Sequence, residues 1–410
     1  MEQRASRRFS WSTTPGSPLE SMFSHRTNWR LTPNALTRAI EEARTSGKKI
    51  LDLTVSNPTE AGVRPDPEIV LAALVNPEAM HYDPQPRGLL GARQAVCRYY
   101  REAHEVFDLD PERVILTTST SEAYSYVFRL LCNAGDEILV PKPSYPLFEF
   151  LADLADVKLV PYPLLYDHGW QIDFDSLYKA ATPQTRSVIL VHPNNPTGSY
   201  VSASETAALN IFCRDYGLAL IVDEVFLDYA YDGAPRSSFL TNADALTFTL
   251  GGVSKISALP QMKLAWVATS GPKEMVAQAG ARLEIIADTF LSMNTPVQLA
   301  APALLDQRKQ IQPILLDRLR VNLAELDGQL AGHPSCARLL VEGGWYVVLR
   351  VPAIESDEDL AIRLLRKASV SVHPGHFYDF PNEGYLVLSL ITEPADFREG
   401  VARLLQVVGV

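Results

Sequence analysis

Four short segments of this chain carry polar side chains that could act together on one ligand. They lie at residues 118–123, 192–198, 222–225 and 251–255. In order, they offer hydroxyl groups, amide groups, a carboxylate and the amine of Lys255. An unprotonated amine can condense with an aldehyde, a carboxylate can hold a protonated ring nitrogen, and hydroxyl and backbone N–H groups can bind a phosphate. The combination, rather than any one segment, predicts a site.

This set of groups suits pyridoxal 5'-phosphate, which carries an aldehyde, a pyridine nitrogen and a phosphate. Lys255 would form a Schiff base with the aldehyde. Asp223 follows the apolar run 218–222, and a carboxylate at the carboxyl end of a central strand points into the ligand crevice of an open α/β sheet. Paired with the pyridine nitrogen, it would keep that nitrogen protonated. Taken alone, Lys255 would be a surface lysine and Asp223 a helix cap.

Further positions suit the rest of this cofactor. The amide of Asn195, in a turn after an apolar run, can donate a hydrogen bond to the phenolic oxygen. Ser119 and Thr120 stand before a helical pattern, where hydroxyl groups and backbone N–H groups bind anions. Tyr145 can stack on the ring. The structural alternatives are a tight turn, a helix cap and a core tyrosine.

The elements that must position these residues alternate between helix and strand from about residue 85 to 290. Apolar strand runs occur at 114–116, 138–140, 188–191, 218–222 and 246–250. Continuous apolar runs are typical of strands buried on both faces, so we expect a mostly parallel sheet covered by helices.

We expect four parts along the chain. Residues 1–22, rich in Arg and Ser, read as a flexible N-terminal extension. Residues 23–60 form an N-terminal arm and part of a small domain, and residues 61–297 form the large cofactor-binding domain. Residues 298–410 form an interdomain helix and a smaller C-terminal α+β domain.

Composition excludes several classes of function. The chain has 410 residues, which suits two unequal domains, and a net charge of -11, which argues against nucleic acid or anionic membrane as a partner. It has no apolar run of about 18 residues, so we expect no membrane span. Its four cysteines show no CxxC spacing, which indicates reduced thiols in a cytoplasmic protein.

In this order, the segments resemble those of the class I/II aminotransferases, which are fold-type I pyridoxal-phosphate enzymes. The resemblance runs from about residue 23 to the C-terminus. It rests on residues 195–198, on Asp223, on residues 254–255, and on Pro260 with a cation at position 263. It implies an α/β fold, with a large domain built on a mostly parallel seven-stranded sheet flanked by helices, and a smaller α+β domain.

The resemblance also implies a role for each residue. Lys255 would be the Schiff-base lysine and the proton shuttle. The other cofactor contacts that it implies within the subunit are Ser119, Thr120, Tyr145, Asn195, Asp223 and Lys263. Tyr82 matches a tyrosine that reaches the phosphate of the neighbouring subunit, which implies a homodimer with shared active sites.

The chain departs from the family pattern at several positions. Ser119 stands where the family usually has glycine, Phe226 where it has tyrosine, and Gly252 where it has serine or threonine. Lys263 replaces an arginine, which keeps the charge but loses the bidentate fork. Val387 stands where the family carries the arginine that grips the substrate α-carboxylate.

A valine cannot bind a carboxylate. Either another cation does so, with Arg26, Arg30 and Arg350 as candidates, or the substrate has no ordinary α-carboxylate. The leading prediction is an aminotransferase that moves an amino group between an amino acid, or a related amine, and a keto acid. The alternatives are a lyase or decarboxylase on the same fold and, ranked last, a non-catalytic cofactor-binding module.

Overall fold

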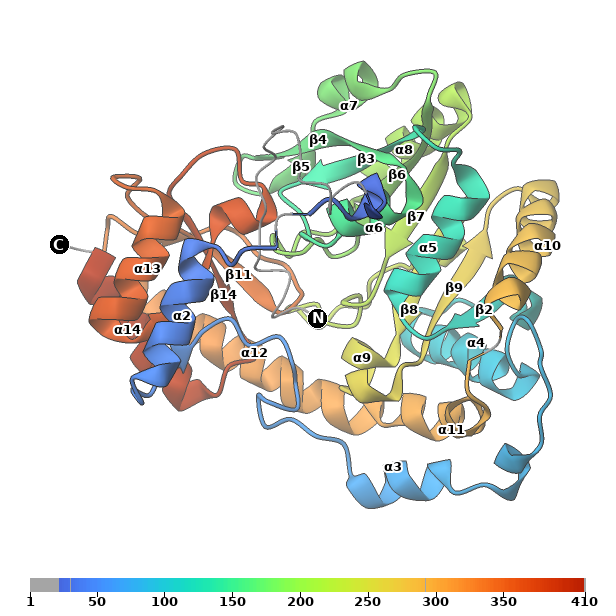
Figure 1. Ribbon diagram of the computed structural model, residues 1–410, viewed down its shortest axis with the longest axis horizontal. Helices are drawn as coiled ribbons and strands as arrows, with labels where there is room; N and C mark the ends of the chain where they lie inside the picture. The colour runs from blue at the N-terminus through green and yellow to red at the C-terminus, as the bar shows by residue number, and fades with distance from the viewer. Residues whose placement is uncertain (1–21, 30, 292, 409–410) are drawn as a thin grey trace.

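The computed structural model describes residues 22–29, 31–291 and 293–408. Residues 1–21 of the expected N-terminal extension, and the candidate cation Arg30, lie outside these described residues. The described chain forms a large α/β body and a smaller α+β body that lie side by side, with a long helix running between them (Figure 1). No helix in the described ranges is long and apolar enough to cross a membrane.

The large body is built on one sheet of eight strands in the part of the chain that the structure describes. In spatial order they are β2 (Val114–Thr117), β9 (Ala265–Ser270), β8 (Thr247–Gly252), β7 (Ala219–Asp223), β6 (Thr185–Val191), β3 (Glu137–Lys142), β4 (Lys158–Tyr166) and β5 (Trp170–Ile172).

The sheet is mostly parallel. Strands β8, β7, β6, β3 and β4 run in one direction, and β9 runs against both β8 and β2. The resemblance implies seven strands, and the structure has eight in this sheet of the described chain. The additional strand β5 is three residues long and pairs antiparallel with the end of β4, which is too short a stretch to leave a hydrophobic pattern.

Both faces of the sheet are covered, as the continuous apolar runs predict. One face packs against α5 (Thr120–Leu131), α6 (Phe148–Ala155) and α10 (Lys273–Phe290). The other packs against α4 (Leu90–His104), α7 (Phe174–Ala180), α8 (Ala203–Tyr216) and α11 (Thr295–Asp306). Successive strand residues enter opposite cores: Ile115 and Ile189 pack on the first face, and Leu116 and Leu190 on the second.

The smaller body has one core shared by the two ends of the chain. Its four-stranded sheet has the order β10 (Ala337–Arg338), β11 (Tyr346–Arg350), β14 (Tyr385–Ser389) and β13 (His373–Pro374). Around it lie α2 (Ala35–Thr45), α12 (Arg308–Leu330), α13 (Asp357–Ala368) and α14 (Pro394–Val408). Strand β1 (Leu51–Asp52) pairs in parallel with β12 (Val370–Ser371), so the N-terminal segment joins the C-terminal one.

Local signals explain several element ends. Ser202 and Glu205 form the capping box of α8, and Gly217 ends that helix with a φ of 66°. Asn34 caps α2 through a hydrogen bond from the Thr37 N–H. Within the described ranges the remaining helices are η2 (His25–Thr27), α3 (Pro67–Leu74), η3 (Pro77–Met80), η4 (Pro111–Arg113), η5 (Phe239–Thr241), α9 (Val253–Ile256), η6 (Pro260–Met262) and η7 (Gly375–Tyr378).

Candidate active site

The sheet brings most of the predicted site residues to one edge. Ser119 follows the carboxyl end of β2, and Tyr145 follows that of β3. Asn195 follows β6, Asp223 ends β7, and Lys255 lies in the short helix α9 directly after β8. Because β2, β3, β6, β7 and β8 all run in the same direction, their carboxyl ends meet at the same edge of the sheet, where open α/β folds bind ligands.

Two further predicted residues reach that edge by different routes. Thr120 is the first residue of α5 and stands next to Ser119. Lys263 precedes β9, and because β9 runs in the opposite direction, its amino end lies at the same edge. The side chain of Lys263 is exposed, and its backbone has a φ of 54°, in the left-handed region.

Asp223 is a buried carboxylate with two hydrogen-bond donors. The Val225 N–H donates to Oδ1 at 3.1 Å, and the Tyr124 hydroxyl donates to Oδ2 at 3.2 Å. Burial raises the pKa of Asp223 to about 6, and the two hydrogen bonds and the charge of Lys255 oppose that rise. Asp223 therefore suits a partner that carries a proton or a positive charge.

Lys255 is half-buried among aromatic rings. Its Nζ lies 4.8 Å from the ring centroid of Trp345 and 5.6 Å from that of Phe226, and it donates to the Ser56 carbonyl oxygen at 3.2 Å. Both distances are within the range of a cation–π contact. Phe226 thus lies at the site, where the family tyrosine would have offered a hydroxyl.

At the start of α5, where a helix can bind an anion, nearby side chains already accept hydrogen bonds from some of the backbone N–H groups. The Ser119 side chain accepts a hydrogen bond from the Glu122 N–H at 3.2 Å, so its hydroxyl caps the helix. The Glu122 carboxylate accepts from both the N–H and the hydroxyl of Thr118. The prediction of Ser119 as a helix cap is therefore confirmed, and an anion at this helix end would meet the first turn of α5 and the Thr120 hydroxyl.

Asn195 carries a buried polar atom that a ligand could satisfy. Its side chain is buried, and its Oδ1 has no hydrogen-bond partner among the described residues. Such an atom costs free energy unless something satisfies it, and rotating the amide would present an N–H group at the same point. Tyr145 is half-buried, with its ring edge-on to Phe148 at 6.0 Å.

Tyr82 is the predicted residue that the subunit does not bring to this edge. It lies in the loop after η3, and its side chain is 71% exposed. Conversely, the structure adds Tyr124, Trp345 and Ser56, which contact Asp223 or Lys255. Tyr124 stands one helical turn after Thr120, so its spacing could have predicted that it lies at the site. Trp345 and Ser56 belong to segments distant in the sequence, and no local pattern predicts their contacts.

The sheet of the smaller body shows what surrounds Val387. Val387 is fully buried and lies directly opposite Val348 and His373 on the neighbouring strands. Tyr346 and Ser389 lie on the same face of this sheet, because residues two apart share a face. That face is turned toward the site, since Tyr346 contacts Phe226 and Ser389 bonds the Val55 carbonyl next to Ser56.

The two described candidate replacement cations are placed differently. Arg26 is exposed and forms an ion pair with Asp156 at the end of α6. Arg350 is exposed at the end of β11, where it lies opposite Tyr385, on the same face of the sheet as Val348 and Val387.

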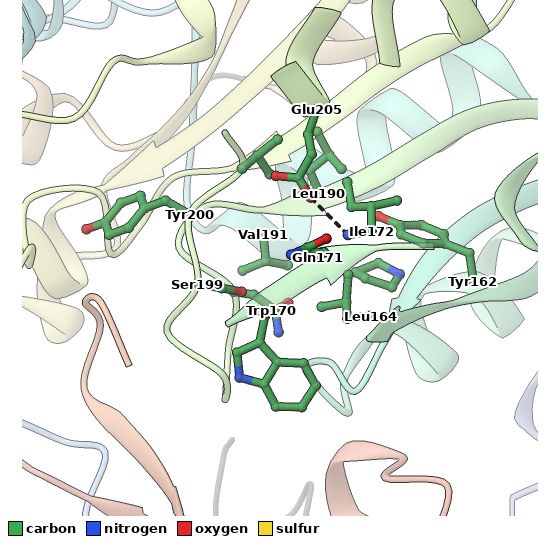
Figure 2. Close-up of a pocket in the computed structure, with 13 residues that line it drawn as sticks. Tyr162, Leu164, Trp170, Gln171, Ile172, Leu190, Val191, Ser199, Tyr200 and Glu205 are labelled. Carbon is green, nitrogen blue, oxygen red and sulfur yellow. Dashed lines mark hydrogen bonds between the residues drawn. The ribbon is translucent and has the colours of Figure 1, made fainter. Parts of the chain in front are cut away.

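A hollow that is partly open to solvent, with a volume of about 330 Å³ when that solvent is included, has Trp170 and Ser199 on its wall (Figure 2). Trp170, Ile172 and Leu190 give it a largely apolar wall, and its Glu205 is already bonded to the Ile172 N–H. Its lining includes Asn194 but none of the predicted site residues.

Comparisons with known proteins place this arrangement in a family. A family model described as aminotransferase class I and II matches residues 48–404. The chain is 28% identical to an alanine aminotransferase of Mycobacterium tuberculosis, over 87% of this chain and 85% of that protein. It is 29% identical to the glutamate-pyruvate aminotransferase AlaA of Escherichia coli K12, over 82% of this chain and 84% of that protein.

Solved structures agree on the fold. An alanine aminotransferase from Pyrococcus furiosus superimposes with a TM-score of 0.83 at 24% identity, covering 94% of this chain and 98% of that one. The family and the α/β fold expected from the sequence are thereby confirmed. Because the family model spans most of its length, the chain belongs to the class I and II aminotransferases.

Proposed function

We propose that this aminotransferase binds pyridoxal 5'-phosphate at the carboxyl edge of the large sheet, with Lys255 as its reactive amine and Asp223 as the partner of the ring nitrogen. The observation that carries the proposal is the placement of a half-buried lysine and a buried carboxylate, close enough for their charges to interact, at that edge. When bound, this cofactor supplies an aldehyde that condenses with amines and a ring that accepts electrons.

The residues present fit this group. The buried amide of Asn195 has an oxygen without a partner among the described residues, and the start of α5 presents N–H groups to an anion. Lys263, which precedes β9, adds a positive charge, and Tyr145 adds an aromatic face. The phosphate, the phenolic oxygen, the ring and the ring nitrogen therefore each have a candidate partner.

The chain's own groups divide the work. Asp223 holds a proton on the nitrogen that faces it, because a buried carboxylate is stabilised by a positive partner. Lys255 Nζ takes the proton that leaves the substrate α-carbon and delivers it to the acceptor carbon. The rings of Trp345 and Phe226 lie beside the amine, with centroids 4.8 Å and 5.6 Å from Nζ.

We infer that the substrates are an amino-acid donor and a keto-acid acceptor. The names of the relatives, alanine aminotransferase and glutamate-pyruvate aminotransferase, favour small 2-amino acids and pyruvate, and favour transamination over a lyase or decarboxylase reaction. Val387 requires that the carboxylate be held by groups other than the family arginine.

The test is a spectral titration of the protein loaded with pyridoxal phosphate. Amino acids and simple amines, added one at a time, should remove its visible absorption band, and a keto acid should restore it. Lys255→Ala should lose that band and the transfer activity, because no other amine takes its place. Lys179→Ala, which removes an exposed lysine on α7, is the matched control and should behave as wild type. An unchanged band in Lys255→Ala would contradict the assignment.

We also propose a homodimer with shared active sites. Exposed apolar side chains follow one another along residues 69–82: Ile69, Leu71, Val75, Met80 and Tyr82. Large exposed apolar side chains gathered in one segment favour an interface there. It would bring Tyr82 to the partner's phosphate, which explains why a single subunit leaves this residue exposed.

Two further proposals concern organisation and location. We propose that residues 61–297 act as the large cofactor-binding domain, and that residues 23–60 act with 298–410 as the small one, which agrees with the pairing of β1 with β12.

We propose a cytoplasmic location, because all four cysteines are free thiols and three of them are buried.

A further inference from the structure

Tyr124 and the Val225 N–H fix both oxygens of the Asp223 carboxylate. Tyr124 comes from α5 and donates to Oδ2 at 3.2 Å, and the Val225 N–H comes from the turn after β7 and donates to Oδ1 at 3.1 Å. Two donors on separate segments define the plane of the carboxylate. The direction in which it meets a ligand is therefore set before the ligand arrives.

Packing holds the Tyr124 hydroxyl in place. The ring is 2% exposed and lies edge-on to Phe148, with centroids 5.3 Å apart and an interplanar angle of 71°. It also contacts Phe128 at 5.9 Å. Phe148 in turn lies edge-on to Tyr145, the residue proposed to stack on the cofactor ring. One aromatic cluster thus connects the proposed stacking residue with the residue that aims Asp223.

The interaction between Tyr124 and Asp223 depends on the proton of the Tyr124 hydroxyl. Burial keeps the pKa of Tyr124 well above 10, so this hydroxyl stays protonated and donates. Burial disfavours the charged form of Asp223, and hydrogen bonds to that form favour it. Three further titratable groups act on Asp223 or Tyr124: Lys255 on α9 lowers the pKa of Asp223, buried Glu224 interacts with Asp223, and the Tyr145 hydroxyl raises the pKa of Tyr124.

We propose that Tyr124 is a positioning residue for the cofactor: its hydroxyl aims Asp223 at the pyridine nitrogen and keeps the carboxylate in the ionised form that holds that nitrogen protonated. The proposal rests on the proposed function, because it requires the ring nitrogen of pyridoxal phosphate to face Asp223.

Tyr124→Phe tests this role, because it removes the hydroxyl and keeps the ring contacts with Phe128 and Phe148. Two ligands are compared by equilibrium binding: pyridoxal phosphate, and an analogue with a C–H group in place of the ring nitrogen. The variant should bind pyridoxal phosphate about tenfold more weakly than wild type, because it loses a hydrogen bond to a charged group. It should bind the analogue as wild type does, since that ligand offers Asp223 no nitrogen.

A spectroscopic readout separates positioning from folding. With pyridoxal phosphate labelled with ¹⁵N in the ring, the nitrogen signal of Tyr124→Phe should move toward that of unprotonated pyridine. The matched control is Tyr162→Phe, which removes another buried hydroxyl, bonded at 2.8 Å to the Ile189 carbonyl; it should match wild type in all three measurements.

Two results would overturn the role of Tyr124. One is equal weakening of both ligands in Tyr124→Phe, which would mean that the hydroxyl supports only the shape of the site. The other is an unchanged nitrogen signal. Failure of the wild-type protein to bind pyridoxal phosphate would instead overturn the proposed function, and the role of Tyr124 with it.

Discussion

At the scale of a residue, burial of Asp223 has two effects: it raises the free energy of the ionised carboxylate, and it makes that carboxylate favour a positively charged partner. Its position could be predicted because an apolar strand followed by a carboxylate is a local signal, and the same holds for Asn195 and Lys255. Tyr124 and Trp345 could not be predicted in this way. Their roles arise when α5 packs beside β7 and when the turn before β11 packs on α9, and such contacts leave no pattern within either segment.

The raised pKa of Asp223 has a measurable consequence for the cofactor-free protein. Because the value rises from 3.8 to about 6, the folded state holds this proton more tightly than the unfolded chain does. That stabilising contribution is complete below about pH 4 and is lost as the pH rises through about 6. Asp223→Asn, which cannot ionise, should therefore be more stable than wild type above that pH, by at most about 3 kcal/mol.

Denaturant unfolding near pH 4 and near pH 8 would measure this difference. The extra stability of Asp223→Asn over wild type should be present near pH 8 and should shrink near pH 4. Asp167→Asn, at a side chain that is 91% exposed, should show no such dependence. A gain of the same size at both pH values would contradict the assigned burial cost.

At the scale of elements, the end of β8 is shaped by its neighbour β9. A Cβ atom at Gly251 would lie 2.8 Å from ring atoms of Trp266, so the indole occupies the space that any side chain there would need. The sheet as a whole could be predicted from its apolar runs, but this contact could not, because it depends on the register of Gly251 opposite Trp266.

Gly251→Ala should therefore destabilise the protein by about 1–3 kcal/mol, because the fully buried indole must move. Gly328→Ala, in the last turn of α12 with open space around it, should instead stabilise the protein, by at most about 0.5–1 kcal/mol. Thermal or denaturant unfolding of the two variants would give the free energies. Equal effects would show that helix and strand propensity, rather than the indole, decides the outcome.

At the scale of the whole molecule, the apolar surface along residues 69–82 predicts how subunits associate. Met80 is 91% exposed, and a charge there should weaken an interface that buries it. Met80→Asp should shift the protein from dimer toward monomer in sedimentation velocity, and should also weaken cofactor binding if Tyr82 acts across the interface.

Ile354→Asp is the control for that experiment. Ile354 is 75% exposed on the smaller body, far along the chain from residues 69–82, and its substitution should leave the sedimentation unchanged. A Met80→Asp variant that stays dimeric would place the interface elsewhere, and a wild-type protein that sediments as a monomer would contradict the proposed homodimer.

The pairing of β1 with β12 also sets an order of events during synthesis. Leu51 and Val370 are partners across 319 residues of chain (370 - 51), so β1 leaves the ribosome long before its partner exists. At about 5–20 residues per second the wait lasts roughly 15–60 seconds. All eight strands of the large sheet are made within that interval. The nascent chain can therefore complete the sheet edge that carries Asp223 and Lys255 before β12 has been synthesised and can pair with β1.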